Sequence, residues 1–355
     1  MDRLMTDVMG LTKKEEFDQL VSVLDKAGEA ILKNPNQWNG CIDALSDDIR
    51  RNTIPLIWIA SFRAQIPEEN PVKGTIAIVE ALIVQGEYNK QLTGRKKAMD
   101  KWRVLLHRYS ELCREMKMFR RGLYYVRLAL DKFQPSPNHL TPAHVDYLML
   151  SMKGCMPHLA LPIINTPIFE VEPKTTGVNA TDFMLYYYYS GLVLISQKQW
   201  ALCLKMLECA MSIVAYGTSA IMVEAYKLYL LVGIIAKGRF LPIPKRASGA
   251  MERIGKQLTQ EYMDFASACE GKDHGRINKL LQEFGEVFEK DNLLPLVEEA
   301  QVSVVRHTIS GLTKVYVTLT LDDMADEVQL PAEKVQEMLV AMIADGGITA
   351  KINRA

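Results

Sequence analysis

The chain has 355 residues, of which 48% are apolar and 24% charged, and its 42 Lys and Arg balance its 42 Asp and Glu. This length exceeds one ordinary hydrophobic core, and the composition excludes a chain that is disordered throughout. The zero net charge removes the usual electrostatic basis for strong non-specific nucleic-acid binding by the whole chain.

Nearly every long segment shows the apolar spacing of an amphipathic helix. The first clear example is 17–32, in which Phe17, Leu20, Val21 and Leu24 share one face. Similar patterns predict helices at 75–85, 97–117, 121–133, 143–152, 181–196, 199–213, 219–236, 249–269, 275–289 and 293–308. Proline and glycine residues mark the breaks between them. The chain is therefore predicted to be all-α.

Two of these breaks indicate tetratricopeptide-like helical hairpins. In the first, Ser110 and Cys113 precede a break at 117–118, and Gly122 opens the next helix. In the second, Gly191 and Ala210 flank a break near 197–199. Small residues at these positions let two helices approach closely, and such hairpins must stack on neighbours to bury their apolar faces. We expect a helical-repeat solenoid.

The last 45 residues follow a different pattern. Alternation at 314–320 and again at 348–352 predicts two short strands. Between them, Thr320 and Asp323 form a capping box that opens a helix, Pro331 suits the first turn of a second, and Gly346 ends it. Strand, helix, turn, helix and strand is the layout of a winged helix.

Helical repeats that end in a winged helix resemble the PCI-domain family, whose members build the proteasome lid, the COP9 signalosome and a translation initiation factor. The segments 183–191, 222–232, 319–325 and 342–353 are most similar to the subunit 3 family of the COP9 signalosome, and the likeness runs from about residue 105 to the end. Family members continue through another strand and a tail helix after the point where this sequence stops.

The resemblance implies a scaffold subunit of the complex that removes the ubiquitin-like modifier from cullins, in the cytoplasm and nucleus. Its partners would be the other PCI and MPN subunits and, through the complex, cullin-RING ligases, with no nucleic acid and no membrane. We expect N-terminal helical repeats over 1–180 and a PCI domain over 181–355, with its helical part at 181–308 and its winged helix at 309–355. A PCI subunit of the proteasome lid or of the initiation factor is the first alternative.

No pattern of catalytic or metal-binding residues is present. The six histidines include no pair spaced one residue apart and no HExxH, and the sequence has no phosphate-binding loop and no GxSxG elbow. Cys203 and Cys209 point to different helix faces. We therefore expect a chain that is not an enzyme, with no catalytic residue, no cofactor and no metal ion. The sparse cysteines and the absence of a signal segment favour a soluble protein of a reducing intracellular compartment.

A nucleic-acid-binding winged helix is the second alternative, and its recognition helix would run from Ala332 to Asp345. That helix carries Glu333, Lys334 and Glu337 and has a net charge of −2, which does not suit contact with phosphates and base edges. The run of tyrosines at 186–189 points around a whole helix, so it favours packing over base stacking.

Charge is concentrated in the segment from Arg95 to Arg121, which holds ten cationic residues against three acidic ones. The simplest interpretation is a solvated helical face. The functional alternative is a docking surface for an acidic partner that includes Arg120 and Arg121.

The predicted strand at 314–320 would offer a second interface. Its outward side chains are Lys314, Tyr316, Thr318 and Thr320, with Val317 at its centre. An exposed strand edge can accept a strand from another chain, and the resembled PCI subunits join through their winged helices. We expect this edge to contact a partner subunit.

Overall fold

The computed structural model describes residues 2–33, 39–64, 71–92, 94–213, 217, 219–249 and 251–352. It divides into two compact units, Met1–Gln197 and Lys198–Ala355. The described residues form helices joined by short turns, together with an isolated parallel bridge between His139 and Glu170. The all-α prediction is confirmed. None of the described helices is long and apolar enough to cross a membrane.

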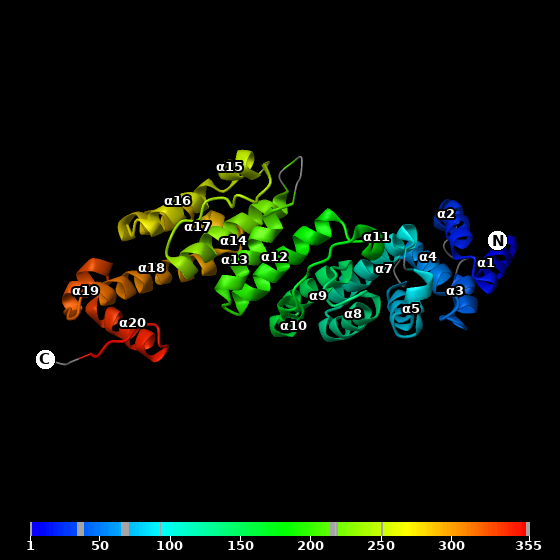
Figure 1. The fold of residues 1–355 in the computed structure, drawn as a ribbon, viewed down its shortest axis with the longest axis horizontal. Coiled ribbons are helices and arrows are strands. Elements are labelled where there is room, and N and C mark those ends of the chain that lie inside the picture. The colour runs from blue at the N-terminus through cyan, green and yellow to red at the C-terminus, as the bar shows by residue number, and fades with distance from the viewer. Residues whose placement is uncertain are drawn as a thin grey trace. The chain divides into compact units, whose positions relative to one another are not determined.

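The first unit is a succession of helices that pack on their neighbours in the chain (Figure 1). They are α1 (Asp2–Lys14), α2 (Phe17–Lys33), α3 (Asn39–Ser46), α4 (Thr53–Arg63), α5 (Pro71–Gln85), α6 (Tyr88–Gln91), α7 (Lys96–Glu115), α8 (Phe119–Phe133), α9 (Pro142–Lys153), a 3-10 turn η2 (Pro157–Ala160), α10 (Leu161–Asn165), α11 (Pro173–Thr176) and α12 (Ala180–Ser196).

The first predicted hairpin is present as α7 and α8. Lys117 lies between them in a left-handed conformation, with φ of 55°, and the chain then reverses into α8. A Cβ atom on Gly122 would lie 3.0 Å from the Cβ of Cys113 and 3.1 Å from Cδ1 of Leu150. The absence of a side chain at Gly122 therefore lets α8 approach α7, as the sequence predicted, and also α9.

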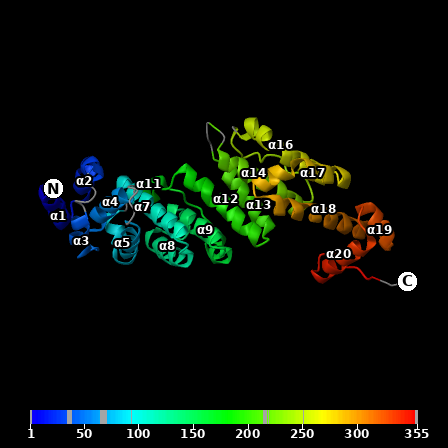
Figure 2. The same ribbon diagram turned by 180° about the vertical axis from the view of Figure 1, so that it is seen from behind.

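The second unit contains the remaining helices, which the reverse view shows clearly (Figure 2). They are α13 (Trp200–Met211), α14 (Ala220–Lys237), a π-helical turn η3 (Met251–Gly255), α15 (Lys256–Leu258), α16 (Gln260–Glu270), α17 (His274–Lys290), α18 (Leu294–Val315), α19 (Leu321–Val328) and α20 (Ala332–Ala344). The predicted helix at 249–269 is divided at Thr259, which has φ of −132°.

The buried helix α14 is the centre of the second unit, and it packs on α13, α16 and α18. Lys227, on α14, is almost enclosed and binds Glu224 at 2.7 Å and Asp291 at 2.7 Å. The hydroxyl of Tyr262 also donates to Asp291, at 2.8 Å. Helices α14 and α16 and the turn after α17 are therefore joined by polar bonds.

Gly238 ends α14 in a left-handed conformation with φ of 62°, and its N–H donates to the carbonyl of Ile234. A Cβ atom here would lie 2.9 Å from Cγ of His307 on α18. We expect Gly238→Ala to lower the free energy of unfolding by about 1–2 kcal/mol, from left-handed strain and crowding together. Urea unfolding would measure this, with Gly249→Ala, which has open space around it, as the control. Equal stability of the two variants would contradict the argument.

The C-terminal helices α19 and α20 form a helix-turn-helix with its own core. That core contains Val305, Ile309, Met324, Ala325, Val328, Val335, Leu339, Met342 and Ile348. The N-cap half of the predicted capping box is present, because the N–H of Asp323 donates to Oγ1 of Thr320 at 3.1 Å, but on the other half the Thr320 hydroxyl, rather than its backbone N–H, donates to the Asp323 carboxylate. Gly346 follows α20 with φ of 70°. The helical half of the predicted winged helix is therefore present.

The two predicted strands of the winged helix are wrong for the described residues. Helix α18 continues to Val315, and the N–H of Tyr316 still bonds to the carbonyl of Leu312 at 2.9 Å. A short alternating segment needs a partner strand for its hydrogen bonds, whereas a helix satisfies them internally. Residues 316–320 form a bend, and 348–352 has no regular structure.

Candidate partner-binding surfaces

Much of the basic segment 95–121 is neutralised inside the first unit. Arg95 pairs with Asp18 at 2.8 Å, and Lys97 pairs with Asp25 at 2.6 Å, which joins the start of α7 to α2. The ammonium of Lys101 lies 3.9 Å from the centre of the Phe62 ring on α4. The first part of the segment therefore serves the packing of the N-terminal helices.

Arg120 and Arg121, which the sequence placed together as interface residues, have different environments. Arg121 donates through Nε and Nη2 to the two carboxylate oxygens of Glu80, both at 2.6 Å. Glu80 lies on α5 with 8% of its side chain exposed, and it also accepts from Tyr109 at 3.2 Å. Arg120 is exposed and forms no ion pair with the described residues. Arg121 therefore holds α8 to α5, and Arg120 remains available to a partner.

A large cleft in the first unit lies between α7, α9 and α12 and has a volume of about 510 Å³. On its wall, Nδ1 of His107 lies 2.8 Å from Oδ1 of the buried Asp146. This hydrogen bond raises the pKa of His107. Arg103 lies 3.7 Å from Asp182 across the same cleft, and Arg108 binds Glu111 at 3.1 Å. Sequence patterns do not reveal this cleft, because two of its charge pairs, His107 with Asp146 and Arg103 with Asp182, join helices that are distant in the chain.

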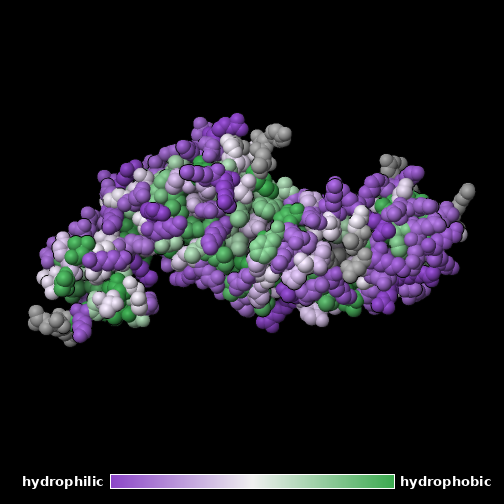
Figure 3. All heavy atoms as spheres, viewed as in Figure 1, coloured by the Kyte–Doolittle hydropathy of each residue, from purple (hydrophilic) through white to green (hydrophobic). Residues whose placement is uncertain are grey.

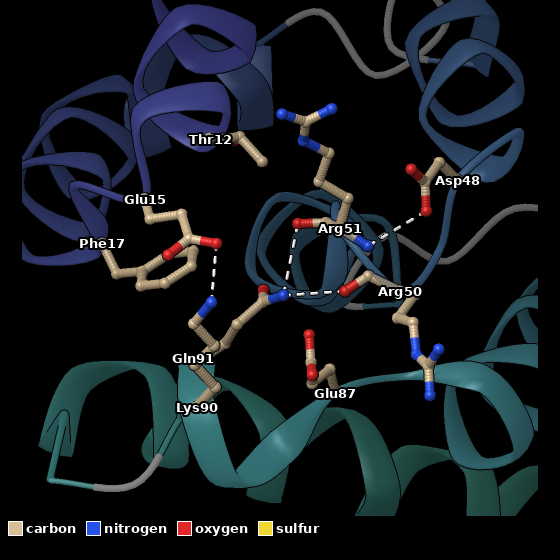
Figure 4. A pocket seen from close by; sticks show the side chains of 9 residues that line it. All are labelled: Thr12, Glu15, Phe17, Asp48, Arg50, Arg51, Glu87, Lys90 and Gln91. Atoms are coloured by element: carbon tan, nitrogen blue, oxygen red, sulfur yellow. Dashed lines mark hydrogen bonds and ion pairs between the residues drawn. The ribbon is translucent and has the colours of Figure 1, made fainter.

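A smaller cleft, of about 160 Å³, lies where α6 meets the turns before α2 and α4 (Figure 4). The side-chain amide of Gln91 is directed at the backbone carbonyls of Arg50 and Arg51, at 2.7 and 3.3 Å. Lys90 pairs with Glu15 at 2.6 Å on the other side. These bonds join three segments of the repeat, so this cleft is a structural joint with its main polar groups already engaged.

One group of side chains among the described residues has the composition of a metal site. Ligand atoms of His139, Glu170 and Glu172 lie within 4.8 Å of one another. Both nitrogens of the His139 ring have partners, since Nε2 pairs with Glu170 at 2.7 Å and Nδ1 bonds to Oγ of Ser136 at 2.8 Å. This group ties the segment after α8 to the segment before α11, which accounts for the isolated bridge at His139.

The C-terminal interface residues Lys314, Tyr316, Val317, Thr318 and Thr320 lie at the end of α18 and in the bend after it. They form no strand edge, so the predicted mode of contact, strand addition, is not available there. They do form an apolar surface, with Val315 74%, Tyr316 52% and Val317 100% exposed. Figure 3 shows further apolar residues at the surface around α19 and α20. Thr320 instead caps α19.

Helical repeats followed by a compact helix-turn-helix define a class of scaffold proteins that present surfaces to partners. A family model described as "COP9 signalosome complex subunit 3, N-terminal helical repeats" matches residues 14–251, and the PCI-domain model matches residues 281–355. The chain belongs to the family of COP9 signalosome subunit 3.

Two curated relatives carry the same name. COP9 signalosome complex subunit 3 of Dictyostelium discoideum is 31% identical over 251 residues, which cover 69% of this chain and 59% of that protein. The Drosophila melanogaster protein is 24% identical over 371 residues, which cover 100% of this chain and 82% of that protein. The chain thus spans about three fifths of the first relative's length. The match to the repeat model begins at residue 14. The family likeness therefore also covers the region before residue 105, which the motifs of the sequence did not reach.

Proposed function

We propose that the chain is a non-catalytic scaffold subunit of a COP9 signalosome, the complex that deneddylates cullins and so regulates cullin-RING ubiquitin ligases in the cytoplasm and nucleus. The observation that carries this proposal is the match of the subunit 3 repeat model and the PCI model to successive parts of one chain. The partners would be the other PCI and MPN subunits, and cullin-RING ligases would be reached through the complex.

The subunit 3 family match favours this assignment over a PCI subunit of the proteasome lid or of an initiation factor. Affinity purification of the full-length tagged chain from its own cells, followed by quantitative mass spectrometry, distinguishes these three assignments. We expect a deneddylase, PCI subunits and cullins to co-purify in constant ratio. Proteasomal ATPases or ribosomal proteins in their place would contradict the proposal.

We further propose that the apolar surface Val315–Val317, with Lys314, Thr318 and Thr320 around it, contacts another subunit. Apolar side chains with this much exposure do not stabilise the isolated fold. Covering them with a partner protein would lower the free energy by removing apolar surface from water. The contact would be made by side chains of a helix end and a bend rather than by a strand edge.

A serine substitution tests this surface. The variant Tyr316→Ser/Val317→Ser removes apolar area from exposed positions, so we expect the free energy of unfolding to stay within about 0.5 kcal/mol of wild type. Co-purification of the other subunits should fall at least about tenfold, as expected for apolar residues central to an interface. The control Leu258→Ser/Val302→Ser changes residues of the same unit with 51% and 44% exposure. If both variants assemble equally well, the C-terminal surface is not the joint.

A further inference from the structure

Helix α8 carries a row of exposed cationic and aromatic side chains along one face. Arg120, Tyr124 and Arg127 recur at intervals of four and three residues, which places them in line on α8, and Lys117 lies in the left-handed turn before the helix. All four are exposed, and 65% of Tyr124 is accessible. Its ring lies edge-on to that of Tyr125, with centres 5.1 Å apart. We call these four residues the basic-aromatic stripe.

The charge of Arg120 is not explained by the fold. Arg120 lies in the first turn of α8, which contains no acidic residue, although the positive end of the helix dipole disfavours a cation there. The neighbouring Arg121 is compensated by Glu80, but neither Lys117 nor Arg120 has a carboxylate within 4.0 Å among the described residues.

Acidic residues near the stripe do not neutralise these two cations. Glu115 is bound by Arg108 at 3.3 Å, and Asp131 is bound by Arg127 at 3.2 Å. Lys117 follows the C-terminus of α7, where a cation suits the helix dipole. Arg120 has no such benefit, so its position costs stability in the isolated chain. Arg120 is an unpaired cation at the positive end of a helix dipole. Its position is best accounted for by a carboxylate that another protein supplies.

We propose that the basic-aromatic stripe docks an acidic segment of a partner protein. Carboxylates of that segment would pair with Lys117 and Arg120, and an apolar side chain would lie against the ring of Tyr124. Arginine and tyrosine are the residue types enriched at protein interfaces, and a cationic face without free carboxylates is complementary to an acidic segment. This surface is separate from the C-terminal surface proposed above, and its test does not depend on assembly of the complex.

The test measures binding of a defined probe to the full chain by fluorescence anisotropy. The probe is a fluorescein-labelled 12-residue peptide that alternates Asp, Glu and Leu, and its reference is the same peptide with Asn and Gln at the acidic positions. We expect the acidic peptide alone to bind, with an affinity that falls as NaCl is raised from 50 to 300 mM. The variant K117E/R120E should reduce binding about tenfold, and Y124S about threefold.

Two measurements separate docking from general effects of charge and folding. The control variant K279E/K334E makes the same change in net charge at exposed residues of the second unit and should bind the peptide as wild type does. The single variant R120E should have a melting temperature equal to or above that of wild type, because a glutamate in the first turn suits the helix dipole.

Three results would overturn the proposal. Wild type could fail to bind the acidic peptide at 50 mM NaCl, or the stripe and control variants could weaken binding equally. The third is a 20-nucleotide single-stranded RNA that binds more tightly than the peptide and loses its affinity in K117E/R120E, which would make the stripe a nucleic-acid surface.

Discussion

Reversing the charge at position 121 with the substitution Arg121→Glu is expected to lower the free energy of unfolding of the first unit by about 3 kcal/mol. The substitution removes both hydrogen bonds to Glu80 and places a second carboxylate beside one that is 8% exposed. Breaking a buried ion pair by changing one partner typically costs about 3–5 kcal/mol, and the cost for Arg121 should be at the low end of this range because its side chain is half exposed. For a unit of this size, the melting temperature should fall by roughly 6–12 °C.

The adjacent Arg120 supplies a matched control for this prediction. Arg120→Glu changes the same residue type by the same charge one position earlier, and we expect no loss of stability. A double-mutant cycle with Glu80→Gln, Arg121→Gln and the pair would give the coupling energy between the two side chains directly. A melting temperature of Arg121→Glu within about two degrees of wild type would show that Glu80 is satisfied without Arg121. The two arginines must therefore be changed separately in any binding experiment.

This contrast shows where sequence patterns stop being informative. Helix boundaries follow from local signals, so the predicted helix at 17–32 is close to the observed α2 (Phe17–Lys33), and the predicted N-cap at Thr320 was correct. The pairing of Arg121 with Glu80 joins residues 41 positions apart. No periodicity records such a pair, because ion pairs between helices depend on how the repeats stack. The high charge of 95–121 was visible in the sequence, but its partners were not.

The error at 314–320 has a different cause. Val315 and Leu319 alternate with polar residues, but they are also four residues apart, which is the spacing of a helix. Periodicity cannot decide between these structures in so short a segment. The deciding factor is hydrogen bonding, since α18 provides an acceptor for each N–H up to Tyr316 and the described residues supply no partner strand. Lys314, Tyr316 and Thr318 are exposed as predicted, but their backbone forms no strand, and Val317, on the opposite face of the predicted strand, is fully exposed as well.

Acidification from pH 7.5 to pH 5 is expected to destabilise the first unit through His144, by about 2 kcal/mol. Burial lowers the pKa of this histidine from 6.5 to about 4, with a smaller contribution from the charge of Arg127. As the pH falls, His144 is therefore protonated near pH 6.5 in the unfolded chain but only near pH 4 in the folded chain. The stability that depends on neutral His144 is complete above pH 6.5 and is lost as the pH falls.

The geometry around His144 explains why the ring resists protonation. Its Nδ1 lies 3.1 Å from the backbone nitrogen of Thr141, the residue that precedes α9. A backbone N–H can only donate, so this bond is made by a neutral Nδ1 and would be lost on protonation. A protonated Nδ1 could instead donate to the carbonyl of Thr141, 3.2 Å away, but that bond raises the pKa of His144 by less than burial lowers it. The ring also lies edge-on to the buried Tyr186, with centres 5.6 Å apart, which leaves no room for water to solvate a charge.

His144→Gln isolates this effect from other groups that titrate nearby. Glutamine at this position can accept the same N–H but cannot be protonated. His107, with a raised pKa, adds stability that is present below pH 6.5 and lost as the pH rises through its folded pKa, and Asp146, with a pKa raised by burial, also favours the folded state in acid. Both opposing contributions are shared by wild type and the variant, so the difference between their urea unfolding curves reports His144 alone. We expect that difference to shift by about 2 kcal/mol in favour of the variant between pH 7.5 and pH 5. A difference that does not change with pH would mean that the cap at Thr141 opens and lets His144 reach water.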